Sequence, residues 1–498
     1  MNARRAADRT AECFNRARPW LRDNAAVVGG MLLTLLYVYN YLAYYALPGN
    51  QPAHPEGWWG WWDQAQFLKS TLALVRLNFS ADQHWYPLGY ALLGVPFAGP
   101  LRLRMHPFFF VDLASLLVAY AAFLSFARRA GLPRQWAAAL FVLAAAADPV
   151  LFLQWVIPWN TTPAGAVLWL LLAVAAAHMA GQRRPMLLGF LAVCVTVLRP
   201  TELLLVLPSV IGVLAVDLRG RRLAWIDVAR FALGAGVPAV LFALLFIRIY
   251  GFQASDYMRA SREIGFTLYG LGWKAYVVLI DPHDWFGGGE GLIARCPWLV
   301  LGLAGLVPAL RRPATAVLAV TLVLHSVLYL AYVDLLPTGL WRSLNVHYWS
   351  WTFPGFALLA VLLLRDLAEA ATRRPAALAL AAAVLALCVR IVPAPAAAGD
   401  AVRALDFAAG ESLSDSVYFD PVELRDARGT MHNIRQMRAI RFGTGVRVLA
   451  LTRPFEMPVS IPDAQVGGAV GMPLAEAIEI GLPTWLWRRD AGALGPRR

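Results

Sequence analysis

The sequence predicts an all-α polytopic membrane protein with a small α/β domain at its C-terminal end. Hydrophobic residues make up 59% of the chain and charged residues 15%, with a mean hydropathy of +0.55. These values lie well outside the averages for soluble domains. Apolar runs of roughly 17 to 25 residues, long enough to cross the hydrocarbon core, recur along most of the chain. The lipid bilayer is therefore the expected environment.

We predict about eleven membrane-spanning helices between residues 25 and 392. The first follows the basic residues 1–24 and is too long for a cleaved signal peptide, so we expect an uncleaved anchor. The predicted spans are residues 25–47, 106–126, 135–153, 163–180, 185–198, 201–216, 226–249, 297–310, 314–336, 352–364 and 375–392.

Basic residues predict the orientation, because short cytoplasmic loops are enriched in Lys and Arg. Six arginines precede the first span, which places the N-terminus in the cytoplasm, and the arginine pairs between later spans then fall on the same side. The net charge of +13 is mostly explained by topology, so nucleic-acid binding is not expected. Frequent Ala and Arg suggest a Gram-negative bacterium, hence the inner membrane and a periplasmic outer side.

The first outer loop, residues 48–105, contains the strongest functional signal. Asp63 follows several tryptophans and begins a segment with the periodicity of an interfacial helix, on which Trp61 and Leu68 share one face and Gln66 the other. The tryptophans, Trp58, Trp59, Trp61 and Trp62, suit the headgroup level. Asp63 could act there as a general base. The alternative is a helix cap.

Four segments, taken in order, carry a family resemblance. They are the Asp63 loop with HWYPLGYALLGVPF (84–97), LRPTELLLVLP (198–208), FGGGEGLIARCPWLVLGLAGL (286–306) and YVDLLPTGLWRSLNVHYWSWTFP (332–354). Together they resemble GT-C membrane glycosyltransferases, and they are similar to bacterial family 39 proteins, which include protein O-mannosyltransferases and the aminoarabinose transferase. The resemblance covers the chain to about Val392.

The resemblance implies a GT-C-like bundle that transfers a sugar from a polyprenyl-phosphate-linked donor to a glycan, glycolipid or protein acceptor at the periplasmic face. It implies Asp63 as the catalytic base of an inverting reaction. The leaving phosphate needs cationic or amide partners. Candidates for donor-phosphate binding are Lys69, Arg342, Arg199 and His347, and candidates for the substrate cavity are Gln66, His84, Tyr86 and Asp82.

The long outer loop, residues 250–296, contains a weak metal pattern. Asp281, His283, Asp284 and Glu290 could ligate a divalent cation. Hydrated loop charges are the commoner explanation, and no D-x-D pair accompanies Asp63. No cofactor is firmly expected.

The C-terminal residues, 393–498, are polar and mixed. VRVLAL (446–451) predicts a strand and PLAEAIEIG (473–481) a helix. We expect a small periplasmic α/β domain without a recognisable functional motif.

Two other functions fit a polytopic protein. A transporter or flippase of lipid-linked intermediates is expected to have paired halves, broken helices near the midplane and mid-span charges. The sequence has no paired halves, and Asp112, Asp148 and Glu202 fall near predicted span ends. A non-catalytic membrane scaffold is the remaining alternative.

Overall fold

The computed structural model describes residues 2–46, 57–146, 148–266, 268, 271–280, 291–332 and 345–388, and eight strands between residues 406 and 467. The chain divides into two compact units. The first contains residues 1–261, 300–325 and 347–374, and the second contains residues 262–299, 326–346 and 375–498.

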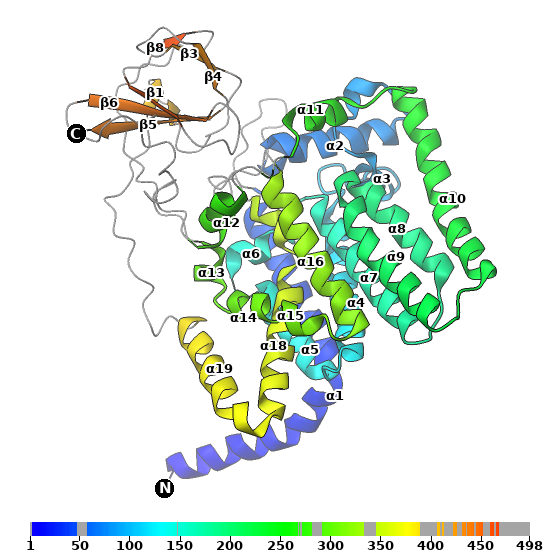
Figure 1. The fold of residues 1–498 in the computed structure, drawn as a ribbon, viewed down its shortest axis with the longest axis vertical. Helices are drawn as coiled ribbons and strands as arrows, with labels where there is room; N and C mark the ends of the chain where they lie inside the picture. Colours follow the sequence, from blue (N-terminus) through cyan, green and yellow to red (C-terminus); the bar gives the residue numbers. More distant parts are fainter. Residues whose placement is uncertain are drawn as a thin grey trace. The chain divides into compact units, whose positions relative to one another are not determined.

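The first unit is a helical bundle around α7 (Thr161–Met179), which packs on α4 (Phe109–Arg129), α8 (Pro185–Leu198) and α9 (Leu203–Arg219). Figure 1 shows these helices side by side. The sequence of α7 is apolar on all sides and rich in Ala, which suits a helix surrounded by others. Most of its side chains are buried.

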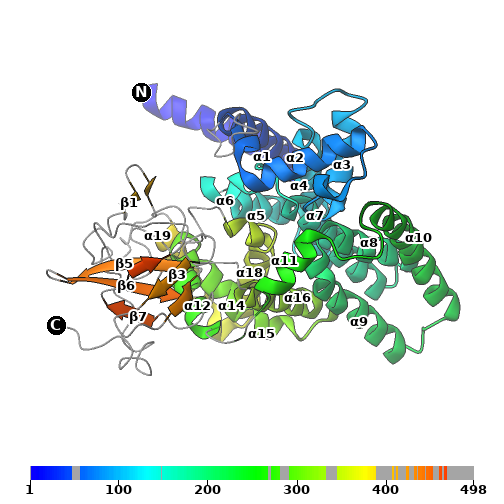
Figure 2. The same ribbon diagram turned by 90° about the horizontal axis from the view of Figure 1, so that it is seen from above.

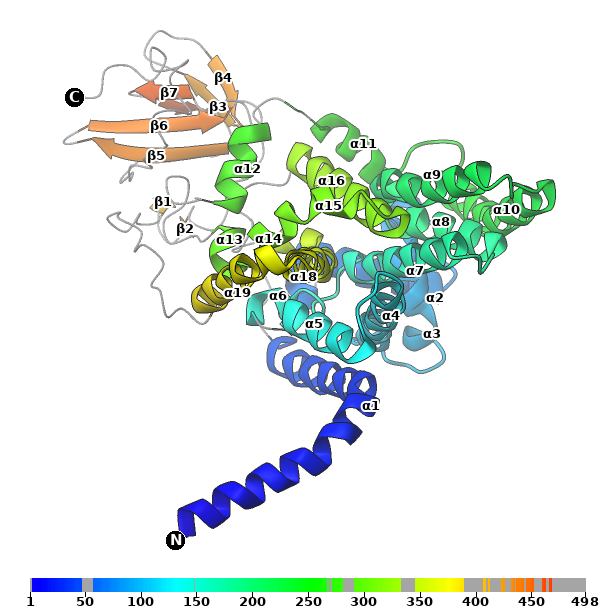
Figure 3. The same ribbon diagram turned by 60° about the horizontal axis from the view of Figure 1, so that its bottom comes forward.

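The helix α10 (Trp225–Tyr250) lies along α8 on the side away from α7, as Figures 2 and 3 show. Two glycines permit this close contact. A Cβ atom on Gly189 of α8 would collide with the Phe231 backbone of α10, and one on Gly234 of α10 would collide with the Met186 backbone. Small residues at such crossings let backbones approach and pack tightly.

The remaining helices of this unit flank the centre. The helix α5 (Arg134–Ala146) packs on α1 (Asn2–Tyr44), α4 and α18 (Phe353–Glu369).

The predicted span 297–310 is wrong as one helix, because it divides into α14 (Leu299–Ala304) and α15 (Leu306–Ala309). A Cβ atom on Gly305, between them, would lie 2.6 Å from the Leu359 carbonyl oxygen, so only glycine fits against α18 there.

Six helical segments of the described chain are long and apolar enough to cross a membrane: Asp23–Tyr44, Phe109–Arg129, Thr161–Met179, Pro200–Arg219, Trp225–Tyr250 and Pro313–Ala331, the last being α16. The chain is thus a helical membrane protein. The other predicted spans coincide with shorter or broken helices, including α8 with 14 residues and α19 (Arg374–Cys388) with 15 residues. The total of about eleven spans therefore stays a prediction.

The predicted span 135–153 is also wrong as one helix. The helix α5 ends at Ala146, and α6 (Pro149–Leu153) begins after Asp148. Asp148 Oδ1 accepts hydrogen bonds from the Val150 and Leu151 backbone N–H groups, at 2.8 and 3.1 Å, and Pro149 occupies the first helical position. An aspartate N-cap followed by proline begins a helix, so this pair separates two helices.

Replacing Asp148 by Ala should destabilise the protein modestly. The change removes the acceptor of both cap bonds, and losing an N-cap costs about 0.5–2 kcal/mol. Asp148→Asn keeps a good cap and should unfold at the wild-type temperature. Thermal unfolding of the two variants in detergent tests this, and equal unfolding temperatures would contradict the capping role.

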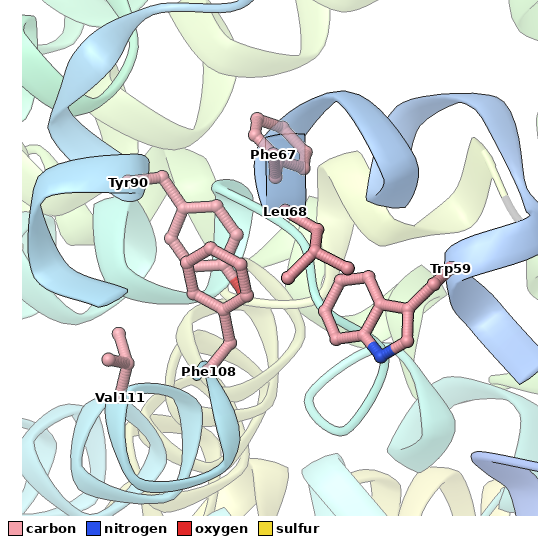
Figure 4. Packing of buried hydrophobic residues seen from close by; sticks show 6 residues of the cluster. All are labelled: Trp59, Phe67, Leu68, Tyr90, Phe108 and Val111. Carbon is pink, nitrogen blue, oxygen red and sulfur yellow. The ribbon is translucent and has the colours of Figure 1, made fainter. Parts of the chain in front are cut away.

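The first predicted outer loop forms η1 (Gly57–Gly60), α2 (Trp62–Val75), η2 (Ala81–Gln83) and α3 (Leu88–Ala98). The expectation that all four tryptophans lie at the headgroup level is wrong for Trp58 and Trp59, which are buried within the protein. Trp59 joins a cluster with Phe67, Leu68, Tyr90, Phe108 and Val111, shown in Figure 4. Trp62 is exposed, which still suits an interface. The cluster fixes α2 and α3 on α4.

Buried charged side chains lie at the C-terminal ends of α7 and α9 and at the N-terminal end of α10. His178 Nε2 lies 3.0 Å from Asp217 Oδ2, and Arg183 pairs with both Asp217 and Asp227. Arg183 belongs to the arginines that the sequence explains by topology alone. Here it also neutralises two buried carboxylates, which would be costly to leave unpaired.

The second unit contains short helices and three small antiparallel sheets. The helices include α12 (Leu271–Leu279), α13 (Leu292–Arg295) and α19, and the sheets have the strand orders β1-β2, β4-β3-β8 and β5-β6-β7. Strand bounds are β1 (Asp406–Ala408), β2 (Glu411–Ser412), β3 (Val422–Arg425), β4 (Met431–Ile434), β5 (Gln436–Phe442), β6 (Gly445–Leu451), β7 (Val459–Pro462) and β8 (Gln465–Gly467).

The strand predicted at 446–451 is confirmed as most of β6, which pairs with β5 from Gln436↔Leu451 to Phe442↔Gly445. The helix predicted at 473–481 lies outside the described residues. The α/β character of the C-terminal domain stays a prediction.

Candidate active site

Asp63 lies in the first turn of α2, at the end of the bundle that is uppermost in Figure 1, where α11 (Asp256–Ile264) also lies. The N-cap position belongs to Trp61, and no side chain makes a cap hydrogen bond there. Asp63 is therefore not the N-cap, although its carboxylate suits the positive end of the helix dipole. Its Oδ1 atom instead accepts a hydrogen bond of 2.5 Å from the Tyr86 hydroxyl.

The surroundings of Asp63 change its acidity. Burial raises the pKa of the carboxyl above its ordinary value, while the Tyr86 hydrogen bond and the positive charge of Arg199 oppose that rise. A carboxylate with a raised pKa is a better proton acceptor than an exposed one. The Tyr86 hydroxyl stays protonated, because burial and the nearby Asp63 charge raise its pKa well above the ordinary value.

Arg199 ends α8 and is held by buried partners. Its Nη1 atom donates to Asn160 Oδ1 at 2.7 Å, and its Nε atom lies 3.1 Å from Glu202 Oε1. The guanidinium also lies over the ring of Tyr348, 5.0 Å from the centroid. The residues of this ion pair are 8% and 1% exposed. A buried guanidinium so held presents a fixed positive charge.

His347 lies in the same region but is not a cation. It belongs to η4 (Asn345–Trp349), is buried, and stacks on Trp159 with 4.0 Å between ring centroids. Burial and the Arg199 charge lower the pKa of His347 well below its ordinary value. The histidine is therefore neutral, and donor-phosphate binding by His347 stays a prediction, which a neutral imidazole could fulfil only through hydrogen bonds.

A second polar network orders the loop between α2 and α3. The Lys69 ammonium donates to the Asp82 carbonyl oxygen at 2.8 Å. His84 is buried, with Ser70 Oγ 2.8 Å from Nδ1 and the Asn78 carbonyl oxygen 3.0 Å from Nε2. A carbonyl can only accept, so Nε2 carries the proton and Ser70 donates to Nδ1. Both ring nitrogens are thus used within the protein.

The four residues predicted to line a substrate cavity lie in different surroundings. Asp82 is exposed, and its carboxylate accepts from the Gln83 amide at 2.5 Å. Gln66 is buried on α2, as are Ala65 and Leu68 on the opposite face. Of the four predicted cavity residues, Tyr86 lines the apolar cavity described next.

An apolar cavity of about 620 Å³ lies between α8, α9 and α10. Its lining is almost entirely hydrophobic and runs along α10 from Phe231 to Tyr250, about 28 Å of helix at 1.5 Å per residue. Tyr86, Pro200 and Tyr257 of α11 also line this apolar groove. Asp63 is not among the lining residues, but the groove adjoins it through the Tyr86 hydroxyl, which donates to the carboxylate.

Five of the predicted site residues lie outside the described part of the chain. They are Arg342 and the residues of the weak metal pattern, Asp281, His283, Asp284 and Glu290. Within the described part, no group of three or more His, Cys, Asp or Glu side chains could hold a metal ion.

The structure adds site residues that the sequence analysis did not select. Asn160 and Glu202 hold Arg199, whose guanidinium lies over Tyr348. Tyr257 contacts Tyr86, and Trp159 stacks on His347. The spacing of Arg199 and Glu202, three residues apart at a span end, was a usable signal for an ion pair. No sequence signal brings Asn160, Tyr257 and Tyr348 together.

Comparison with known proteins gives little. Neither a protein family nor a curated protein sequence matches the chain. Among solved structures, the chain is similar to the archaeal oligosaccharyltransferase AglB from Archaeoglobus fulgidus, in complex with an inhibitory peptide and a dolichol-phosphate. The identity is 11%, the TM-score is 0.41, and the similarity covers 74% of this chain and 55% of that one. The chain thus spans about half of that protein, and a similarity of this size does not establish a shared fold or activity.

Proposed function

We propose that this chain is an integral membrane glycosyltransferase that transfers a sugar from a polyprenyl-phosphate-linked donor to a hydroxyl or amine of an acceptor. The observation that carries the proposal is the apolar groove between α8, α9 and α10, whose lining includes Tyr86, the residue that donates a hydrogen bond to Asp63. An apolar chain of a lipid carrier suits such a lining, and a carboxylate beside it suits proton removal from an acceptor.

In the proposed reaction, the acceptor oxygen or nitrogen attacks the anomeric carbon of the donor sugar and gives its proton to Asp63. The bond between that carbon and the phosphate oxygen breaks, and polyprenyl phosphate leaves. Attack from the face opposite the phosphate inverts the anomeric configuration. Arg199, whose charge is fixed by Glu202 and Asn160, would stabilise the negative charge on the leaving phosphate.

The charge balance favours a second cation beside Arg199. Asp63 and Glu202 carry two negative charges against the single positive charge of Arg199, and His347 is neutral. Lys69 is bound to the Asp82 carbonyl. We keep Arg342, which lies in the segment 332–354 that resembles the family, as the proposed second partner of the donor phosphate.

Filling the groove should block carrier binding. Ala239 lines the groove, and Ala239→Trp would occupy part of its volume. Polyprenyl phosphate should raise the unfolding temperature of the wild-type protein in detergent, because a ligand that binds only the folded state stabilises it. The shift should be lost in Ala239→Trp.

The matched control is Leu241→Trp on the same helix, whose side chain is 64% exposed and does not line the groove. It should keep the wild-type shift. If polyprenyl phosphate stabilises neither protein, or stabilises Ala239→Trp fully, the groove does not bind the carrier.

A further inference from the structure

Tyr86 belongs to two parts of the site at once. Its ring lines the apolar groove, and its hydroxyl donates to Asp63 Oδ1. The ring contacts Phe67 of α2 and Tyr257 of α11, with centroid distances of 4.8 and 5.1 Å. No other residue that lines the groove has a hydrogen bond to Asp63 within the described part of the chain.

We propose that Tyr86 is a positioning residue that couples the groove to Asp63: a carrier chain packed on its ring fixes its hydroxyl on the carboxylate. The inference rests on the proposed glycosyl transfer and deepens it. Pro87 follows directly, and its fixed φ restricts the backbone that presents the tyrosine. With Oδ1 held by Tyr86, the other oxygen of Asp63 is directed to the acceptor.

The charged and titratable groups around this pair come from three other elements. Arg199 at the end of α8 acts on Asp63, and Tyr257 of α11 and Tyr348 of η4 act on Tyr86. Because the Tyr86 hydrogen bond holds the pKa of Asp63 down, removing the hydroxyl should raise that pKa. A base works only when deprotonated, so activity falls as the pH drops through its pKa.

Tyr86→Phe keeps the ring and removes the hydroxyl. We expect kcat/KM to fall roughly ten- to a hundredfold, the range for a hydrogen bond to a charged group. The acid limb of the pH–rate profile should move to higher pH. Polyprenyl phosphate should still raise the unfolding temperature, because the ring remains in the groove. Tyr86→Ala, which removes both, should lose the stabilisation as well.

Tyr120→Phe is the matched control. It removes a buried tyrosine hydroxyl that donates to the Ala26 carbonyl oxygen at 3.0 Å, away from Asp63. Its acid limb should stay where the wild-type limb lies. The substrate for these rates is the polyprenyl-linked sugar lipid extracted from cells that lack the protein.

The outcomes separate this inference from the proposed function. If Asp63→Asn is inactive but Tyr86→Phe has the wild-type pH profile and rate, the positioning role is wrong and glycosyl transfer stands. If Asp63→Asn is as active as wild type, the proposed function itself fails. A shifted acid limb in Tyr86→Phe with carrier binding retained is the result that supports the inference.

Discussion

Asp63→Asn should abolish glycosyl transfer while leaving the protein folded and at its normal abundance. Losing a general base costs about 10²- to 10⁴-fold in rate. Asparagine has nearly the same size as aspartate and can still accept the hydrogen bond from Tyr86, so the local packing should survive. The measurement is the rate of consumption of the extracted polyprenyl-linked sugar lipid by membranes that contain equal amounts of each protein.

Asp148→Asn provides the matched control for that substitution. It makes the same chemical change at the N-cap of α6, where Asn remains a good cap. Wild-type activity in Asp148→Asn together with none in Asp63→Asn assigns the loss to the Asp63 carboxylate. Full activity in Asp63→Asn would instead mean that Asp63 only supports α2.

Arg199→Ala should both destabilise the protein and remove activity. The side chains of Arg199 and Glu202 are 9% and 2% exposed, and removing one partner of a buried ion pair typically costs about 3–5 kcal/mol, because the other charge is left uncompensated. In the proposed reaction Arg199 stabilises the leaving phosphate, so its loss should lower the rate by about 10²- to 10³-fold, as for other charge-stabilising groups. Thermal unfolding and the lipid-consumption assay measure the two effects.

The double variant Arg199→Met/Glu202→Leu separates these effects. Replacing a buried ion pair by hydrophobic residues of similar volume is often neutral or stabilising, so the double variant should recover most of the lost stability. It should remain inactive, because the cation is still missing. Recovery of activity with stability would show that Arg199 acts only in folding.

The long apolar helices were predictable because their signal is local. Spans such as α4, α7 and α10 follow from uninterrupted apolar runs of sufficient length. The errors fell at breaks inside apolar runs. Asp148 with Pro149 begins a new helix, and the close contact of Gly305 with α18 accompanies another break; the first break is visible in the sequence, and the second depends on a distant helix.

The site was predictable only in part, because some of its properties depend on contacts between residues that are distant in the sequence. Asp63, Tyr86 and Arg199 could be selected because each lies in a segment of distinctive sequence. The neutrality of His347 could not be predicted, because it depends on burial against Trp159 and on the charge of Arg199. The partners of Lys69 and His84 likewise lie in the folded loop between α2 and α3.

The transporter and scaffold alternatives make different demands on the same residues. A flippase needs polar groups along a path through the membrane, whereas the cavity that reaches Tyr86 is lined almost entirely by apolar side chains. A scaffold needs neither the Tyr86–Asp63 bond nor the buried Arg199 pair for its activity. Both alternatives predict that Asp63→Asn retains function.

The most direct test of the central claim is mass spectrometry of lipid-linked sugars and envelope glycans in cells that lack this protein. The cells are complemented with the wild-type protein or with Asp63→Asn at equal membrane abundance. Glycosyl transfer by Asp63 predicts that a polyprenyl-phosphate-linked sugar accumulates, that a glycan modification disappears, and that only the wild-type protein reverses both changes. Reversal of both changes by Asp63→Asn would contradict it.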